Sequence, residues 1–269
     1  MIYVRVTDLN DYMFCPRKIY LKRVLGIKEE KGFDAIFGSI IHDIFDEFNQ
    51  SEQDLIYRID DDYPFDYIYN LYETKITEII NNTLEKFMDE IHEFKVDPEY
   101  IFLKIKKHVY DEVLERAKNV YDALQKYREY GIFLWDKLEP KIYSELELMS
   151  DTLKMVGRID RVEVYSERMI PIEIKSGRPS KSHLLQLHAY ALLLQKNYPN
   201  FSVDWGVLYY TKLNKKKEVK MSKKIYSWVE ELRDKIISLI ESEKDPGLCS
   251  NPRKCEKCAL RHYCNKINT

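Results

Sequence analysis

Charged residues stand within two short apolar runs that read as neighbouring strands. Gly157-Arg158-Ile159-Asp160 is followed, after a turn, by Pro171-Ile172-Glu173-Ile174-Lys175. If the strands pair, Asp160 and Glu173 can converge, and two carboxylates are the hard oxygen donors that Mg²⁺ or Mn²⁺ prefers. Glu173 and Lys175 are two residues apart, so they share one face of a strand. Lys175 would then lie beside the metal, where its charge can orient or deprotonate an attacking water.

The plainer interpretation of these residues is that they are ordinary charges on an edge strand. The bare pattern D-x12-E-x-K matches many sequences by chance. Burying Glu and Lys within apolar strands is nevertheless costly unless they pair or bind a metal. That cost favours a metal-binding site over ordinary surface charges.

Three further residues have types that suit a metal-dependent site. His42 lies in a helical pattern whose other inward positions are apolar, and imidazole is a good Mn²⁺ ligand. A lone helix His is, however, more often a core or surface residue. Gln186 and Tyr190 are four residues apart, hence on one helix face, where they can hydrogen-bond a phosphate or stack on a base. As a bare spacing, Q-x3-Y is weak.

The five cysteines are an odd number and unevenly placed. A disulfide scaffold would be unusual in a reducing compartment and would leave one thiol over. Cys255-x2-Cys258-x5-Cys264 forms a tight cluster that lacks a fourth ligand. Either Cys249, close by, or Cys15, near the N-terminus, can complete it. With Cys249 the spacing is that of a C-x5-C-x2-C-x5-C zinc knuckle.

The apolar periodicities show which elements must position these residues. Residues 1–30 predict one or two short helices, 33–48 a helix with His42, and 51–65 a polar, turn-rich segment. Long helical patterns then give way at Pro140 to strands and a mixed α/β order. The remaining predicted elements are helices at 66–94, 98–130, 181–196 and 228–240, and strands at 141–149, 153–164, 169–175, 203–210 and 216–221.

This order predicts four parts that form one compact unit together. They are N-terminal helices (1–50), a helical insertion (51–139), the α/β core (140–243) and a cysteine segment (244–269). The insertion carries amphipathic helices with no chemistry of their own.

Composition excludes several classes of protein. With 269 residues, of which 45% are apolar, the chain can bury a sizeable core. The 43 basic and 45 acidic residues give a net charge of −2, which excludes a polycationic nucleic-acid coat but not a local basic groove. No run is apolar enough for a membrane helix, and the N-terminus does not read as a signal peptide, so we expect a cytoplasmic protein. The 8 glycines form neither a Walker loop nor GxGxxG, so no ATP or dinucleotide is expected.

The order His, Asp, Glu-x-Lys, Gln-x3-Tyr resembles that of the PD-(D/E)xK nucleases, and among them the RecB-like branch. The resemblance covers His42 and roughly 140–210. It implies an α/β nuclease core, a mixed β-sheet flanked by helices, with a helical insertion and an Fe–S-closed N/C-terminal region. Where the family has Pro-Asp this chain has Ile159-Asp160, and RecB-like members commonly have Gly-x-x-Asp, as here. The implied metal ligands are His42, Asp160, Glu173 and the Ile174 carbonyl; Lys175 is the implied catalytic lysine, and Gln186 and Tyr190 form the downstream motif.

The same resemblance gives the cysteines a role. Iron–sulfur RecB-like nucleases pair one N-terminal Cys, usually followed by Pro-Arg, with a C-terminal C-x2-C-x5-C, and Phe14-Cys15-Pro16-Arg17 fits that pattern. The implied ligands of a [4Fe–4S] cluster are Cys15, Cys255, Cys258 and Cys264, with Cys249 left over. The cluster would tie the two chain ends together, a structural rather than a redox role. Zinc is the alternative.

Small members with this layout are CRISPR-associated exonucleases of spacer acquisition, which implies a Mn²⁺- or Mg²⁺-dependent DNA exonuclease. The implied substrates are single-stranded DNA or frayed ends, cleaved 5′→3′, and the implied partners are CRISPR integrase proteins. The alternatives are a stand-alone RecB/AddB-like repair or viral nuclease, a restriction-type endonuclease, and a non-catalytic Fe–S DNA-binding partner. The intact Asp160, Glu173 and Lys175 argue against the last. A basic run can follow a phosphate backbone; its members are Lys212, Lys215, Lys216, Lys217, Lys220, Lys223 and Lys224.

Overall fold

The computed structural model describes residues 1–28, 33–60, 62–175, 179–210, 213, 215–249 and 251–266. The chain forms two compact units, each described here by itself. The sheet unit consists of Met1–Glu30, Leu146–Val162 and Glu167–Thr269, and the helical unit of Lys31–Glu145 and Glu163–Ser166. The boundaries expected after residues 50, 139 and 243 remain predictions.

The sheet is mixed, as the sequence predicts. In the described part of the chain it has six strands in the order β1-β3-β4-β5-β6, with β2 paired to β3 outside that path. β1 is parallel to β3, β4 is parallel to β5, and β5 is antiparallel to β6. The strands are β1 (Val4–Arg5), β2 (Lys141–Ser150), β3 (Met155–Val164), β4 (Met169–Lys175), β5 (Trp205–Tyr210) and β6 (Lys215–Lys220). All but β1 coincide, within two residues at each end, with the strands expected from alternation.

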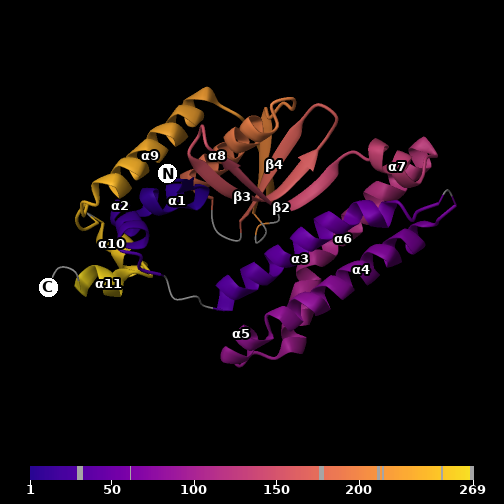
Figure 1. Ribbon diagram of the computed structural model, residues 1–269, viewed down its shortest axis with the longest axis horizontal. Coiled ribbons are helices and arrows are strands. Elements are labelled where there is room, and N and C mark those ends of the chain that lie inside the picture. The colour runs from indigo at the N-terminus through magenta and orange to yellow at the C-terminus, as the bar shows by residue number, and fades with distance from the viewer. Residues whose placement is uncertain are drawn as a thin grey trace. The chain divides into compact units, whose positions relative to one another are not determined.

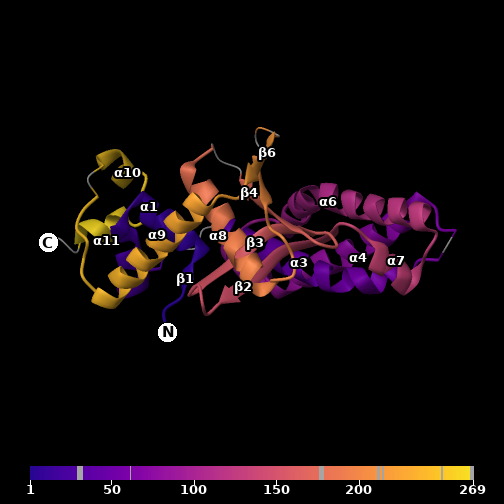
Figure 2. The same ribbon diagram turned by 90° about the horizontal axis from the view of Figure 1, so that it is seen from above.

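Helices of the sheet unit cover the strands that carry the charged residues. The middle of α8 is buried from Leu185 to Leu194, and the helix packs on β4 and β5 (Figure 1). On its other side α8 contacts α1 and α9, and α9 lies along α1 (Figure 2). The helices of this unit are α1 (Val6–Phe14), α2 (Pro16–Ile19), the π-helix η1 (Tyr20–Val24), α8 (Lys181–Asn197), α9 (Lys223–Ser242), α10 (Pro252–Glu256) and α11 (Arg261–Lys266).

Gly157 on β3 has a packing role in this arrangement. A Cβ at this position would lie 2.6 Å from the side chain of Val6, 2.8 Å from Tyr190 and 3.2 Å from Leu193. Contacts below 3 Å between carbon atoms require the neighbours to move, and overpacking of a core is destabilising. Glycine therefore lets α1 and α8 approach the strand three residues before Asp160, which gives the Gly-x-x-Asp sequence a physical reason.

The helical unit is built on long amphipathic helices around one apolar core. The apolar stripes predicted for the insertion are buried, among them Ile76, Ile80, Ile105 and Val109. α4 packs against both α3 and α6 (Figure 1). The N-terminus of α6 is capped by Asp97, whose side chain accepts from the Glu99 N–H at 2.9 Å. The helices are α3 (Phe33–Ile56), α4 (Phe65–Lys86), α5 (Met88–Glu93), α6 (Pro98–Tyr127) and α7 (Gly131–Lys137).

The expectation of a turn-rich segment from residue 51 is wrong for its first part, because α3 continues to Ile56. Leu55 and Ile56 are buried in the core of the helical unit. Glu52 is buried too, where its carboxylate accepts a hydrogen bond from Arg116 at 2.8 Å. From the sequence, Glu52 was expected to be a solvent-exposed charge in a turn. The helix can continue through this position because Arg116 compensates the buried carboxylate. None of the helices among the described residues is long and apolar enough to cross a membrane.

Candidate active site and cysteine pocket

Asp160, Glu173 and Lys175 lie together on β3 and β4. The backbone N–H of Ile174 donates a hydrogen bond to Asp160 Oδ2 at 2.6 Å, which holds this carboxylate against the adjacent strand. Lys175 Nζ forms an ion pair with Glu173 Oε1, as expected for two residues on one face of a strand. Pairing of β4 with β5 sets Glu173 beside Leu208 and Lys175 beside Tyr210.

The two carboxylates of this group lie in a poorly solvated environment. Glu173 is 0% exposed, and its burial is costly for a charged group unless it is compensated. Burial also raises the pKa of Asp160 above its ordinary value, although the Lys175 charge and the Ile174 N–H act in the opposite direction. A buried carboxylate and a partly buried one beside a lysine form an arrangement that a bound cation would stabilise.

Gln186 and Tyr190 lie on the buried face of α8, as their spacing predicts. Gln186 Nε2 donates to the Tyr190 hydroxyl at 3.1 Å, and Gln186 Oε1 accepts from Asn10 Nδ2 at 2.8 Å. Asn10 of α1 therefore fixes the orientation of the Gln186 amide. Sequence reasoning gave Asn10 no role, since nothing local marks a residue 176 positions from its partner.

His42 lies on α3 in the helical unit, at the helical position that the sequence predicts. Its Nδ1 lies 3.6 Å from Glu145 Oε2 of β2, within ion-pair range. The carboxylate faces one ring nitrogen, an arrangement that often orients a histidine. The role of His42 as a metal ligand remains a prediction.

The donor set of the sheet unit suits a hard divalent cation. In the part of the chain that the structure describes, no three His, Cys, Asp or Glu side chains are grouped as a metal site. Two carboxylates and a backbone carbonyl are nevertheless oxygen donors of the kind that Mg²⁺ and Mn²⁺ take. Asp160, Glu173 and the Ile174 carbonyl therefore fit such an ion by their chemistry.

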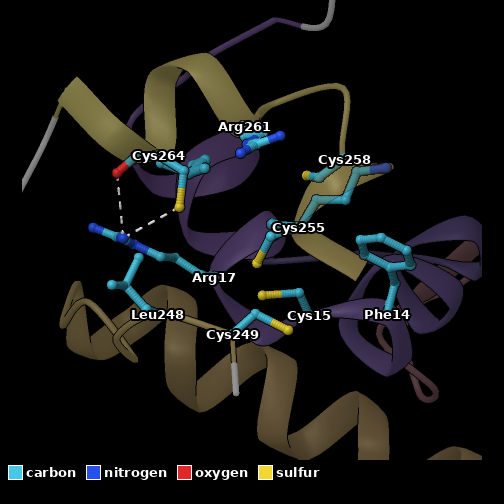
Figure 3. Close-up of a pocket in the computed structure, with 11 residues that line it drawn as sticks. Phe14, Cys15, Arg17, Leu248, Cys249, Cys255, Cys258, Arg261 and Cys264 are labelled. Atoms are coloured by element: carbon cyan, nitrogen blue, oxygen red, sulfur yellow. Dashed lines mark hydrogen bonds between the residues drawn. The ribbon is translucent and has the colours of Figure 1, made fainter. Parts of the chain in front are cut away.

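All five cysteines line one pocket, which has a cavity volume of about 50 Å³ (Figure 3). Cys15 is buried between α1 and α2, and Cys255 and Cys264 lie on α10 and α11. The structure thus brings the N-terminal cysteine to the C-terminal cluster. The thiol of Cys249, expected to be left over, also lies against those of Cys15 and Cys255 (Figure 3).

Basic residues from both chain ends hold this pocket together. Arg17, 1% exposed, donates from Nη1 to Cys264 Sγ at 3.2 Å and from Nη2 to Asp245 at 2.7 Å. Lys254 Nζ donates to the carbonyls of Met13 and Phe14 at 3.1 and 2.9 Å. Positive groups beside thiolates favour their deprotonated, metal-binding form. Five thiols suit a soft metal centre, and both the presence of such a centre and its four ligands remain predictions.

The basic run is only partly placed, because Lys212 lies outside the described residues. Lys215–Lys220 form β6, on which Lys216 and Lys220 lie over the rings of Tyr209 and Trp205, at 5.6 and 5.7 Å from the centroids. Its contact with a phosphate backbone remains a prediction.

A family model described as the PD-(D/E)XK nuclease superfamily matches residues 4–265. The chain belongs to this superfamily. Membership agrees with the mixed sheet flanked by helices, with Asp160 on β3 and with Glu173 and Lys175 on β4. The nuclease fold expected from the sequence is therefore confirmed.

Curated relatives of this nuclease carry CRISPR-associated names. CRISPR-associated exonuclease Csa1 of Saccharolobus solfataricus is 25% identical over 96% of this chain and 84% of its own length. CRISPR-associated exonuclease Cas4 of Thermoproteus tenax is 26% identical over 43% of this chain and 62% of its own. A CRISPR-associated exonuclease Cas4/endonuclease Cas1 fusion of Myxococcus xanthus is 30% identical over 45% of this chain and 22% of its own. The first of these similarities includes the helical unit, and the other two cover less than half of the chain.

Proposed function

We propose that this nuclease is a Mn²⁺- or Mg²⁺-dependent DNA exonuclease that hydrolyses single-stranded DNA or DNA ends in the 5′→3′ direction. The observation that carries the proposal is the group Asp160, Glu173 and Lys175, intact in a member of a nuclease superfamily. The names of the relatives support a CRISPR-associated role, within which the family resemblance implies the processing of fragments for spacer acquisition. The fusion of one relative to an endonuclease named Cas1 supports such an endonuclease as the partner, and the family resemblance implies that this partner is the CRISPR integrase.

Each residue of the group has a distinct part in this hydrolysis. A divalent cation, when bound, supplies Lewis-acid polarisation of the phosphate and activation of water. Asp160, Glu173 and the Ile174 carbonyl would hold it, and His42 is the further ligand that the family resemblance implies. Lys175 orients the attacking water and offsets the charge that develops on the phosphate. Gln186 and Tyr190 provide hydrogen-bond donors for the phosphate oxygens, with Asn10 keeping the amide in place.

Metal removal and strand polarity test this function in one assay. Protein dialysed against a chelator should leave single-stranded DNA intact, and Mn²⁺ or Mg²⁺ should restore its degradation because the carboxylates alone cannot activate water. A strand blocked at its 5′ end should persist while one blocked at its 3′ end is degraded. Covalently closed duplex serves as the control and should persist. Binding of DNA with no degradation would point to a non-catalytic partner, and cutting of closed circles to a restriction-type endonuclease.

We infer that the cysteine pocket holds a [4Fe–4S] cluster on Cys15, Cys255, Cys258 and Cys264. Support comes from the soft donor set and from the position of Cys15 beside the C-terminal cysteines. The N-terminal ligand would join the two ends of the chain.

Cys15→Ser and Cys249→Ser, compared in anaerobically purified protein, test this ligand set. We expect Cys15→Ser to lose the visible absorption and most of the iron, because the cluster then lacks a thiolate. Cys249→Ser, the matched control in the same pocket, should keep both. A colourless protein with stoichiometric zinc, which loses the zinc on Cys249→Ser but not on Cys15→Ser, would establish the zinc knuckle instead.

A further inference from the structure

A second pocket of the sheet unit, with a cavity volume of about 450 Å³, lies between α1, α8 and α10. Its polar lining comes from three different parts of the chain. Asn10 and Asp11 belong to α1, Lys18 to α2, Lys181 and His183 to the first turn of α8, and Lys254 to α10. It is separate from the cysteine pocket, although Phe14 and Lys18 line both.

The pocket carries net positive charge. Among the described residues that line it, Asp11 is the one carboxylate, and it is paired with Lys18 at 2.8 Å and with Lys22 at 2.7 Å. Lys254 donates hydrogen bonds to the neutral carbonyl oxygens of Met13 and Phe14, which leave its charge uncancelled. Lys181 adds another positive charge at the exposed rim. A pocket lined in this way attracts anions.

Two side chains of the wall connect this pocket to the proposed active site. Asn10 donates to Gln186, which is bonded in turn to Tyr190. On the opposite wall, His183 Nδ1 lies 3.3 Å from the Tyr210 hydroxyl, and Tyr210 is paired with Lys175 across β4 and β5. Burial and the nearby Lys175 charge lower the pKa of His183, so its ring is neutral near pH 7. An anion in the pocket would therefore lie close to Gln186, Tyr190 and Lys175, the residues proposed to act on the scissile phosphate.

We propose that this pocket binds a DNA phosphodiester group that lies, on the same strand, next to the phosphodiester being cut. Lys181 and Lys254 are its cationic contacts. The inference rests on the proposed nuclease function and adds a second binding position to its substrate. Since Lys254 belongs to the cysteine-rich segment, that segment would contribute directly to substrate binding. The contact is to the backbone, so it carries no preference for base sequence.

Lys181→Gln tests the position with little risk to the fold, because this side chain is exposed. The measurement is the dissociation constant of fluorescein-labelled single-stranded oligothymidine, at several salt concentrations and without added divalent cation. We expect several-fold weaker binding, equal for oligothymidine and oligoadenine, and a salt slope reduced by about 0.7, the value for one lost phosphate contact on a single strand.

Lys196→Gln is the matched control, because it removes one exposed charge from the opposite end of the same helix. If the two variants bind DNA with the same affinity and salt slope, the pocket does not bind the strand. If Lys181→Gln only relieves inhibition by thymidine monophosphate, the pocket holds free product and the proposal is again wrong. A wild-type protein that binds or degrades no DNA would contradict the proposed function itself, which separates the two failures.

Discussion

Glu173→Gln is expected to reduce DNA degradation by about 10²–10³-fold or more, a loss typical of removing one preorganised electrostatic group. The substitution keeps the shape of the side chain and removes the negative charge that the divalent cation requires. It also takes away the ion-pair partner of Lys175 Nζ. The measurement is the initial rate of release of nucleotides from end-labelled single-stranded DNA in saturating Mn²⁺.

The free energy of unfolding separates this role from a structural one. Glu173 is 0% exposed, so the wild-type fold includes the cost of desolvating its charge. Lys175 is 23% exposed and keeps access to water when its partner is neutral. We therefore expect stability to change by no more than about 1 kcal/mol, or to rise, while activity falls.

Glu218→Gln, on the exposed surface of β6 in the same sheet, is the control and should change neither property. Unchanged degradation by Glu173→Gln would remove Glu173 from the site. Loss of activity together with a large loss of stability would make its role structural.

Site residues that lie a few positions apart on one strand or one helix could be found from the sequence. Glu173 and Lys175 share a face because strands have a period of two, and Gln186 and Tyr190 because helices have one of 3.6. The sequence Cys15-Pro16-Arg17 was given a role only by the family resemblance, because spacing alone left Cys15 and Cys249 as alternatives.

The same periodicities predicted the strands from β2 to β6 within two residues at each end. The single helix expected over 66–94 is wrong, because the structure has two helices there, α4 and α5. The structure also starts α9 at Lys223, five residues before the expected start, and the last turns of α3 were not predicted.

The residues missed act through partners that are distant in the sequence. Asn10 orients Gln186 from 176 positions away. Arg17 was named in the Cys-Pro-Arg pattern, but its hydrogen bond to Cys264, 247 positions away, was not predicted. β1 is two residues long, too short for any alternation, and exists because Val4 and Arg5 pair with β3. Buried charged residues such as Arg116 cannot be told from solvent-exposed ones in the sequence, because only tertiary packing determines which charged side chains are buried. The sequence pattern therefore gave the helical unit its core but none of its polar network.

Arg116→Met is expected to destabilise the protein by about 3–5 kcal/mol, the range for breaking a buried ion pair on one side. The guanidinium, 1% exposed, binds Glu52 at 2.8 Å and Asn49 at 2.8 Å and also pairs with Glu112. Asn49 Oδ1 accepts in turn from the Ser144 N–H at 3.1 Å, so the network anchors the start of β2. Urea unfolding followed by circular dichroism measures the change, and Lys118→Met on the exposed face of α6 is the control, expected within about 0.5 kcal/mol.

The pH dependence of this loss identifies its cause as the Glu52 charge. Burial raises the pKa of Glu52 above its ordinary value of 4.5 even with Arg116 opposing it, and removal of Arg116 should raise it further. When the pKa of a carboxyl is higher in the folded than in the unfolded state, the protein loses stability as the pH rises through the folded-state pKa. The loss in free energy of unfolding caused by Arg116→Met should therefore be small near pH 4.5 and largest at pH 7. Adding Glu52→Leu to Arg116→Met removes the unpaired charge and should recover most of the stability at pH 7. A loss that is equal at both pH values, or that the second substitution leaves unchanged, would mean that the packing of the Arg116 side chain, rather than its charge, stabilises the helical unit.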